Sequence, residues 1–455
     1  MESKPAVYTD GSHCTLNEIR VLEILPFEEF SETINTICRI ISLASGTSTE
    51  TYVALSYTWG KPNDTSYICI NGHKHKVTPN LESALRHLRG HKAKVVIWVD
   101  AVCVNQNDIP ERDTQLKMMA DIYRKAEKGL SWLGEESDDS SLAFRMIQRW
   151  ASLGIPHGMS RGELSAFFKN TLQDEIFMPR SVTALKKMLQ RPYWKRVWIL
   201  QEVTLPPIVT MQCGHELLPF SVVGVFAYIM QDIQKEYHSG FWSSFVHDLI
   251  PTDTDTISLI QWTFYRMLKS VDYEKDEAPH LLHHLYASIS LESTDPRDQI
   301  FALLGLPGFE KYRSLVRPSY IKSTSEVFSE AARIMIEEEN NLDAIVFARS
   351  LRLCCSNLPL PSWVPDWTAR GTILAPLVHF RGKSHDPVAK LSDYVNFSAD
   401  GQILSVTGLL HDEVSVLKGR YSTAPMKSHG EWEQLSDLKD NSLPNGLTVS
   451  QAVFL

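Results

Sequence analysis

The sequence predicts an α/β fold in which helices cover both faces of a parallel sheet. Between residues 50 and 135, short apolar runs typical of strands alternate with runs of helical periodicity, in the order strand, helix, strand, helix, strand. The run 95–99 is apolar at every position, as expected of a central parallel strand that is buried on both faces. Such alternation favours parallel pairing through right-handed crossovers.

Local signals place the first elements of this fold. Strands are predicted at 20–26, 34–43 and 52–57. The pair Asn71-Gly72 separates two β-prone runs, 66–70 and 73–77, and therefore predicts a hairpin. Thr78 and Pro79 then give a cap and a first-turn proline, so a helix is expected to begin there.

A second helix and the rest of the chain follow from similar signals. Asp108 and Glu111 have the spacing of a capping box, so a helix is predicted from that point to a strand at 130–133. Helices are expected over most of 142–203 and 220–345, and strands at 208–213 and 403–408. The proline-rich stretch 358–367 is predicted to be a loop or an edge segment. We expect four parts: N-terminal strands at 1–49, an α/β domain at 50–203, a mainly helical region at 204–345 and a mixed α/β region at 346–455.

Composition excludes several classes of protein. The 455 residues carry a formal net charge of −9, and no basic cluster suited to nucleic acid is visible. No stretch approaches the ~18 apolar residues of a membrane span. Residues 1–10 are polar and lack the apolar core of a signal peptide, so a cytoplasmic protein is expected.

The cysteines and histidines do not predict a metal site. The seven cysteines are irregularly spaced with no C-x-x-C pair, which is typical of reduced, buried thiols. Zinc needs a compact Cys/His set, and the nearest candidates are His280, His283 and His284 on one predicted helix. We interpret them as ordinary surface or cap histidines.

Four blocks resemble one known family, the fungal heterokaryon-incompatibility (HET) domain proteins. The blocks are YVALSYTWG at 52–60, the run that opens IWVDAVCVNQ at 97–134, RPYWKRVWILQE at 191–202, and DPRDQIFALLGL at 295–306. The first three fall inside the predicted α/β domain. The fourth lies outside it.

The resemblance implies a role in non-self recognition between fungal cells, in which the domain triggers programmed cell death. The HET domain is in turn similar to TIR domains, which implies a three-layer, flavodoxin-like parallel sheet. Some TIR domains cleave NAD at the nicotinamide–ribose bond with a glutamate four residues after a tryptophan, in a W-C-x-x-E-L pattern. Trp198 and Glu202 reproduce that step, although Ile199 replaces the cysteine and Val203 the leucine. Glu202 is therefore the candidate catalytic residue, and NAD is a candidate substrate rather than a cofactor.

The residues around Glu202 support an interpretation that does not depend on the resemblance. Trp198 and Trp194 precede Glu202 by one and two helical turns, so a single helix would place all three on one side. A carboxylate against indole rings is partly desolvated and suited to acid–base work, or to stabilising an oxocarbenium-like ribose. Trp198 is thus a candidate ligand contact. The alternative is a surface glutamate near a helix C-terminus.

Polar residues also follow two predicted parallel strands, where α/β folds bind ligands. Ser56 and Tyr57 end one strand, Trp59 and Gly60 follow, and Asp100 comes directly after the other strand. Trp59 offers a stacking surface, and Gly60 lets a ligand approach the backbone. The alternative is that Ser56 and Asp100 cap helices while Trp59 lies in the core.

Two further residues, Arg112 and Cys103, have chemistry suited to a site. Arg112, in the first turn of its helix, either binds a phosphate there or pairs with a carboxylate such as Asp108 or Asp100. Cys103 has no histidine near it in sequence and is interpreted as a buried structural thiol. The sequence contains no G-x-x-x-x-G-K-[ST] or G-x-S-x-G motif, so neither an NTPase motor nor a common α/β hydrolase is indicated.

Two functions remain open at this point. One is an effector enzyme, a TIR-like NAD hydrolase that oligomerisation switches on. The other is a non-catalytic signalling or adaptor module. The expected partner is a second copy or another HET or incompatibility protein. Family members commonly carry a longer C-terminal region, so this one is interpreted as truncated, divergent or partial.

Overall fold

The fold comes from a computed structural model that describes residues 8, 14–44, 50–60, 64–153, 179–238, 254–269, 280–352, 358–369 and 394–407. The chain divides into two compact units, 1–327 and 328–455. Every site discussed below belongs to the first unit. In the described ranges, no helix has both the length and the apolar character needed to cross a membrane.

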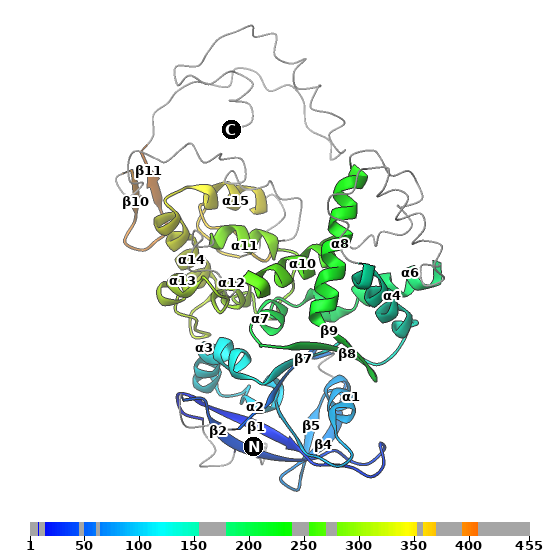
Figure 1. The fold of residues 1–455 in the computed structure, drawn as a ribbon. Coiled ribbons are helices and arrows are strands. Elements are labelled where there is room, and N and C mark those ends of the chain that lie inside the picture. The colour runs from blue at the N-terminus through cyan, green and yellow to red at the C-terminus, as the bar shows by residue number, and fades with distance from the viewer. Residues whose placement is uncertain are drawn as a thin grey trace. The chain divides into compact units, whose positions relative to one another are not determined.

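One sheet forms the framework of the first unit (Figure 1). Among the described residues it contains nine strands in the order β5-β4-β2-β1-β6-β3-β7-β8-β9. They are β1 (Glu18–Ile24), β2 (Asn35–Ser42), β3 (Val53–Tyr57), β4 (Ser66–Ile70), β5 (His73–Val77), β6 (Val95–Trp98), β7 (Lys128–Trp132), β8 (Val209–Cys213) and β9 (Glu216–Pro219). Each strand predicted within 20–133, and the strand near 208–213, is confirmed.

The inner four strands, β6-β3-β7-β8, are parallel. The first of these strands in the chain, β3, lies second in the row, after β6, and β7 and β8 follow in chain order. This is the flavodoxin-like arrangement. The predicted α/β class is confirmed. Antiparallel strands extend the sheet on both sides, because β1 pairs antiparallel with β6 and β9 with β8. The connections leave β3 and β7 in opposite directions, so the carboxyl ends of these two strands form the topological switch point.

Helices cover both faces of the parallel strands. Helix α1 (Pro79–Leu88) and the short helix α7 (Ile199–Thr204) lie on opposite faces of the sheet (Figure 1). Helix α3 (Ile109–Lys125) connects β6 to β7. Both predicted capping residues act as expected. The Thr78 hydroxyl accepts from the amide of Leu81 at 3.3 Å, and the Asp108 carboxylate accepts from that of Glu111 at 3.1 Å.

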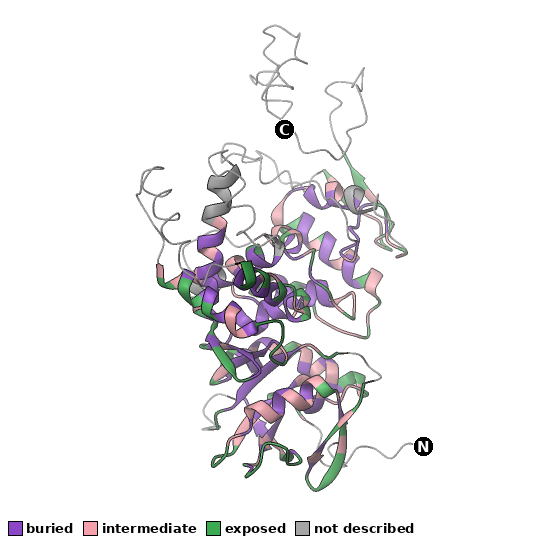
Figure 2. Ribbon diagram, turned by 90° about the vertical axis from the view of Figure 1, so that its right-hand side faces the viewer, coloured by how far each residue is buried: buried purple, intermediate pink, exposed green. Residues whose placement is uncertain are grey.

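The first unit has further helices among its described residues. They are α2 (Asp100–Cys103), α4 (Ser140–Leu153), α6 (Pro179–Leu189), the 3₁₀ turn η3 (Pro192–Lys195), α8 (Phe220–His238), α10 (Thr254–Lys269), α11 (Leu281–Ala287), α12 (Asp298–Leu304) and α13 (Glu310–Leu315). Helix α14 (Thr324–Glu339) spans the division between the units. Strands β1, β3, β7 and β8 are mostly buried (Figure 2), and Trp98 and Trp132 are fully enclosed in the core.

The second unit is smaller in its described part. It contains α15 (Asp343–Arg352) and the antiparallel pair β10 (Val395–Phe397) and β11 (Leu404–Val406). The last of these confirms the strand predicted near 403–408. Residues 358–367 contain no helix or strand, as their prolines predicted.

Candidate functional site

A buried carboxylate, that of Glu202 on α7, lies at the switch point of the sheet. Its side chain is 3% exposed, and Arg196 donates hydrogen bonds to both of its carboxylate oxygens. Nη1 of Arg196 lies 2.9 Å from Oε2, and Nη2 lies 3.0 Å from Oε1. The hydroxyl of Ser56, near the carboxyl end of β3, donates to Oε2. Charge-assisted bidentate pairs of this kind are strong and geometrically specific.

Further hydroxyl groups complete the cluster. Ser131 on β7 pairs in register with Ser56 on β3, so the two side chains lie side by side. The hydroxyl of Tyr193 donates to Ser131 at 2.8 Å and lies 3.2 Å from that of Ser56. The hydroxyl of Tyr123, from α3, is 3.4 Å from Oε1 of Glu202. Burial raises the pKa of both tyrosines well above the usual range, so they remain neutral donors.

The chain around Arg196 is not the single helix predicted from 194 to 202. The 3₁₀ turn η3 ends at Lys195, Arg196 is extended, and α7 begins at Ile199. The break arises because the backbone at 196–197 pairs with Glu292. The amide of Val197 donates to the Glu292 carbonyl at 2.9 Å.

The two tryptophans consequently serve other contacts. The indole of Trp194 donates to the carbonyl of Met188 at 3.0 Å. The indole of Trp198 donates to the carboxylate of Asp298 at 3.1 Å. The expectation that indole rings surround Glu202 is wrong, because the Arg196 guanidinium and the hydroxyls of Ser56 and Tyr123 hold its carboxylate instead.

Asp100 extends the polar cluster toward the surface. It is the first residue of α2, two positions after the end of β6, and its Oδ2 accepts from the indole of Trp59 at 3.0 Å. Burial raises the pKa of Asp100 to about 6, although Arg196 opposes the rise. Trp59 is 43% exposed, so the alternative that placed it in the core is wrong. Gly60, beside it, has a φ of +82° and open space around its Cα.

The other candidates occupy different places. Tyr57 is buried in the core, where burial raises its pKa well above the usual range. Arg112 stacks on the ring of Tyr320, with its guanidinium 4.5 Å from the centroid. The suggested pairing of Arg112 with Asp108 is wrong, because Asp108 caps the helix and the ring of Tyr320 covers the guanidinium.

The thiols and histidines lie as ordinary side chains. Cys103 is fully buried, and burial raises its pKa, so it has the character of a structural thiol. Cys354 and Cys355 lie outside the described residues. Nδ1 of His284 lies 2.8 Å from the carbonyl of His280, one turn earlier. Across the residues with described positions, no group of three His, Cys, Asp or Glu side chains has a metal-binding arrangement.

A second buried ion pair stabilises the same half of the sheet. Arg20 on β1 is 1% exposed and contacts Glu111 at 2.5 Å and 3.0 Å. Arg20 also donates to the carbonyl of Cys103 at 3.1 Å. Glu111 is therefore a paired structural residue as well as a capping-box position. It provides a natural control for Glu202.

The fourth sequence block packs directly on α7. The side-chain amide of Gln201 donates to the carbonyls of Ala302 at 2.9 Å and Phe301 at 3.3 Å. Gly305 leaves room for Gln201, because a Cβ there would lie 2.4 Å from the amide nitrogen. The block at 295–306 thus holds the helix that carries Glu202.

Comparison with known proteins places this site within one family. Residues 52–202 match the family described as Heterokaryon incompatibility protein (HET). The chain thus contains a region that matches the HET domain. It is also 26% identical to the Neurospora crassa protein named Heterokaryon incompatibility protein 6, OR allele, over 77% of this chain and 58% of the relative. The chain therefore spans less than two thirds of that relative's length. No solved structure matches it.

The region that matches the HET family contains the whole polar cluster around Glu202. The match begins at Tyr52, one residue before β3, and ends at Glu202 itself. All the members of the polar cluster therefore lie inside the HET domain. They are Ser56, Trp59, Asp100, Tyr123, Ser131, Tyr193, Arg196 and Glu202. Strands β1, β2, β8 and β9 lie outside it and enlarge the sheet on both sides.

Sequence reasoning missed four members of the cluster. Arg196, Tyr193, Tyr123 and Ser131 were not singled out, although all four lie within the blocks that resemble the family. Ser131 lies within the strand predicted at 130–133, and in the structure it is one residue from the carboxyl end of β7. Arg196 could not, because its position depends on the backbone pairing with Glu292.

Proposed function

We propose that this chain acts in fungal heterokaryon incompatibility, as an effector that promotes cell death in the cytoplasm. The HET domain and the Neurospora relative support the role in incompatibility. Because the chain spans 58% of that relative, its signal and partners do not transfer directly. The partner we propose is a second copy of the chain or another incompatibility protein.

We propose further that the Glu202 cluster cleaves NAD at the nicotinamide–ribose bond. The observation that carries this proposal is the convergence of Glu202, Ser56, Arg196 and Asp100 at the carboxyl ends of β3, β6 and β7. Flavodoxin-like sheets bind ligands at this switch point. The exposed ring of Trp59 provides a stacking surface at its edge.

The chemistry follows from the charges. The glycosidic C–N bond breaks with its electron pair passing to nicotinamide, whose ring nitrogen becomes neutral. The ribose left behind has oxocarbenium character, which the Glu202 carboxylate stabilises. Water then adds to the anomeric carbon and loses its proton, yielding ADP-ribose and nicotinamide. Burial strengthens these electrostatic effects.

Access to Glu202 requires a local movement. The Glu202 side chain is 3% exposed, whereas that of its partner Arg196 is 18% exposed. Displacement of Arg196 would release both carboxylate oxygens from the guanidinium, leaving Ser56 and Tyr123 as their partners and opening a place for the ribose hydroxyls. We propose that association between copies drives this displacement, so that activity rises with protein concentration.

Glu202→Gln is expected to reduce nicotinamide release from NAD by at least about tenfold, because the carboxamide cannot balance the developing positive charge. The measurement follows release by the full chain over a range of protein concentrations. Glu111→Gln is the matched control, since it alters a buried, Arg-paired glutamate elsewhere in the same domain. Equal release from wild type and Glu202→Gln would refute the catalytic proposal.

A second candidate function is a non-catalytic signalling module. The observation in its favour is that both oxygens of Glu202 already have partners, as in a structural ion pair. This function predicts that wild-type protein releases no nicotinamide at any concentration. It also predicts that cells expressing Glu202→Gln die as readily as cells expressing the wild type.

A further inference from the structure

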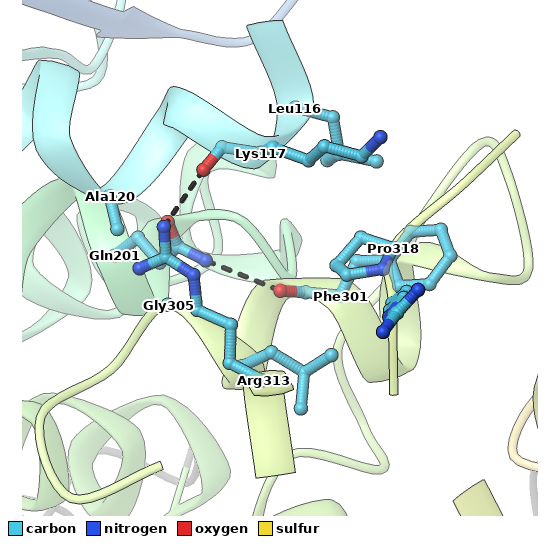
Figure 3. Close-up of a pocket in the computed structure, with 10 residues that line it drawn as sticks. Leu116, Lys117, Ala120, Gln201, Phe301, Gly305, Arg313 and Pro318 are labelled. Carbon is cyan, nitrogen blue, oxygen red and sulfur yellow. Dashed lines mark hydrogen bonds between the residues drawn. The ribbon is translucent and has the colours of Figure 1, made fainter. Parts of the chain in front are cut away.

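A cavity of about 320 Å³ lies beside α7, bounded by α3, α12 and the segment around α13 (Figure 3). Its apolar wall includes Leu116 and Ala120 from α3, and Phe301 and Pro318 from the opposite side. A second cavity adjoins it and shares Leu304, Gly305 and Arg313. The volume lies at the lower end of the range for small-molecule sites.

One residue that lines this cavity carries a buried polar atom without a hydrogen-bond partner among the described residues. Gln201, which lines the cavity, is 2% exposed, and its amide nitrogen is used by the carbonyls on α12. Its Oε1 has no hydrogen-bond partner among the described residues. One turn later, Thr204 lines the adjoining cavity, and its hydroxyl is likewise unpartnered within the described part of the chain. Buried acceptors are normally satisfied, so both positions suit a bound group that donates hydrogen bonds.

The rim of the cavity carries positive charge. Lys117, Arg313 and Arg317 line it, and no carboxylate is among its lining residues. Arg313 reaches from α13 to the backbone of α3, donating to the carbonyl of Lys117 at 2.9 Å (Figure 3). In the adjoining cavity, Glu310 is the carboxylate among the lining residues. An anionic group is therefore favoured at the first cavity.

We propose that this cavity binds a nucleotide. The phosphate would lie against Lys117, Arg313 and Arg317, the base against the apolar wall, and an amino or hydroxyl group would donate to Oε1 of Gln201. Such a ligand combines the three features that the cavity offers: positive charge, an apolar wall and a buried acceptor. The proposal does not depend on catalysis at Glu202, because binding alone tests it.

The test is calorimetric titration of the full chain with AMP, adenosine and inorganic phosphate. AMP is expected to bind more tightly than either fragment. The double variant Lys117→Gln/Arg317→Gln should weaken AMP binding by at least about tenfold, since two charge-assisted contacts are lost. Both side chains belong to exposed residues, so the unfolding temperature should stay within about 3 °C of wild type.

The matched control is Lys76→Gln/Lys92→Gln, which removes the same charge from exposed positions elsewhere in the unit. It should change AMP affinity by less than about twofold. Absence of AMP binding at millimolar concentration would overturn the proposal, as would equal loss of affinity in both double variants. Adenosine binding as tightly as AMP would overturn the assignment of the cationic rim to a phosphate.

Discussion

Glu202→Ala is expected to lower the free energy of unfolding by about 3–5 kcal/mol, because it leaves the Arg196 guanidinium buried without its counter-charge. The equivalent change at the other ion pair, Glu111→Ala, should cost at least as much. Arg20 is 1% exposed, whereas Arg196 is 18% exposed and has Asp100 nearby. Chemical denaturation at pH 7 measures both changes, with the wild type as reference.

Removing both charges of a pair provides the control. Arg196→Met/Glu202→Leu should be much closer to wild type in stability than Glu202→Ala, because no uncompensated charge remains. Arg20→Met/Glu111→Leu should behave in the same way. A loss below about 1 kcal/mol for Glu202→Ala would show that water or Asp100 serves Arg196 adequately. It would also show that the pair contributes little to the fold.

This stability effect determines how activity has to be tested. An alanine at 202 would lower activity simply by unfolding the protein, even if the carboxylate had no catalytic role. Glutamine keeps the shape of the side chain and part of its hydrogen bonding. Comparison with Glu111→Gln then separates damage to the fold from loss of chemistry, because both variants weaken a buried pair of similar geometry.

Local sequence signals predicted the elements well because local interactions set them. The hairpin turn at Asn71-Gly72 requires positive φ at both residues, and the structure has 51° and 81° there. Thr78 and Asp108 cap their helices with their own side chains. The antiparallel pairing of β1 with β6 was not predicted, although both strands were, because it joins residues about 70 positions apart.

The site was predicted in part for the same reason. Ser56 and Asp100 could be placed because they follow apolar runs that form parallel strands. The surroundings of Glu202 could not, since helical spacing put Trp198 beside it. The extended conformation of Arg196 interrupts the predicted helix and brings the guanidinium of Arg196 to the Glu202 carboxylate. The exposure of Trp59 also depended on its hydrogen bond to Asp100, which local pattern does not reveal.

Asp298, at the start of the fourth block, makes the fold sensitive to pH. It is 7% exposed and accepts hydrogen bonds from Trp198 at 3.1 Å and Tyr320 at 2.7 Å. Burial nonetheless raises the pKa of Asp298 to about 7, and the charge of Asp295 adds to the rise while Arg112 opposes it. In the unfolded chain the same carboxyl has a pKa of about 4. Between these values the folded protein holds a proton that the unfolded chain has lost.

Asp298→Asn is therefore expected to stabilise the protein at pH 8 relative to pH 5, each compared with wild type. In the wild type, the contribution of Asp298 falls as pH rises from about 4 to 7 and is constant above, with a full loss of at most ~4 kcal/mol. Asparagine stays neutral, so the difference in unfolding free energy between variant and wild type should grow through that window. Measuring this difference at several pH values removes the contribution of carboxylates common to both proteins.

Asp100→Asn should act in the same direction over a narrower range, because the pKa of Asp100 is about 6. If the difference between Asp298→Asn and wild type is the same at pH 5 and pH 8, the buried carboxyl does not titrate in this range, and the link from Trp198 to the fourth block is insensitive to pH.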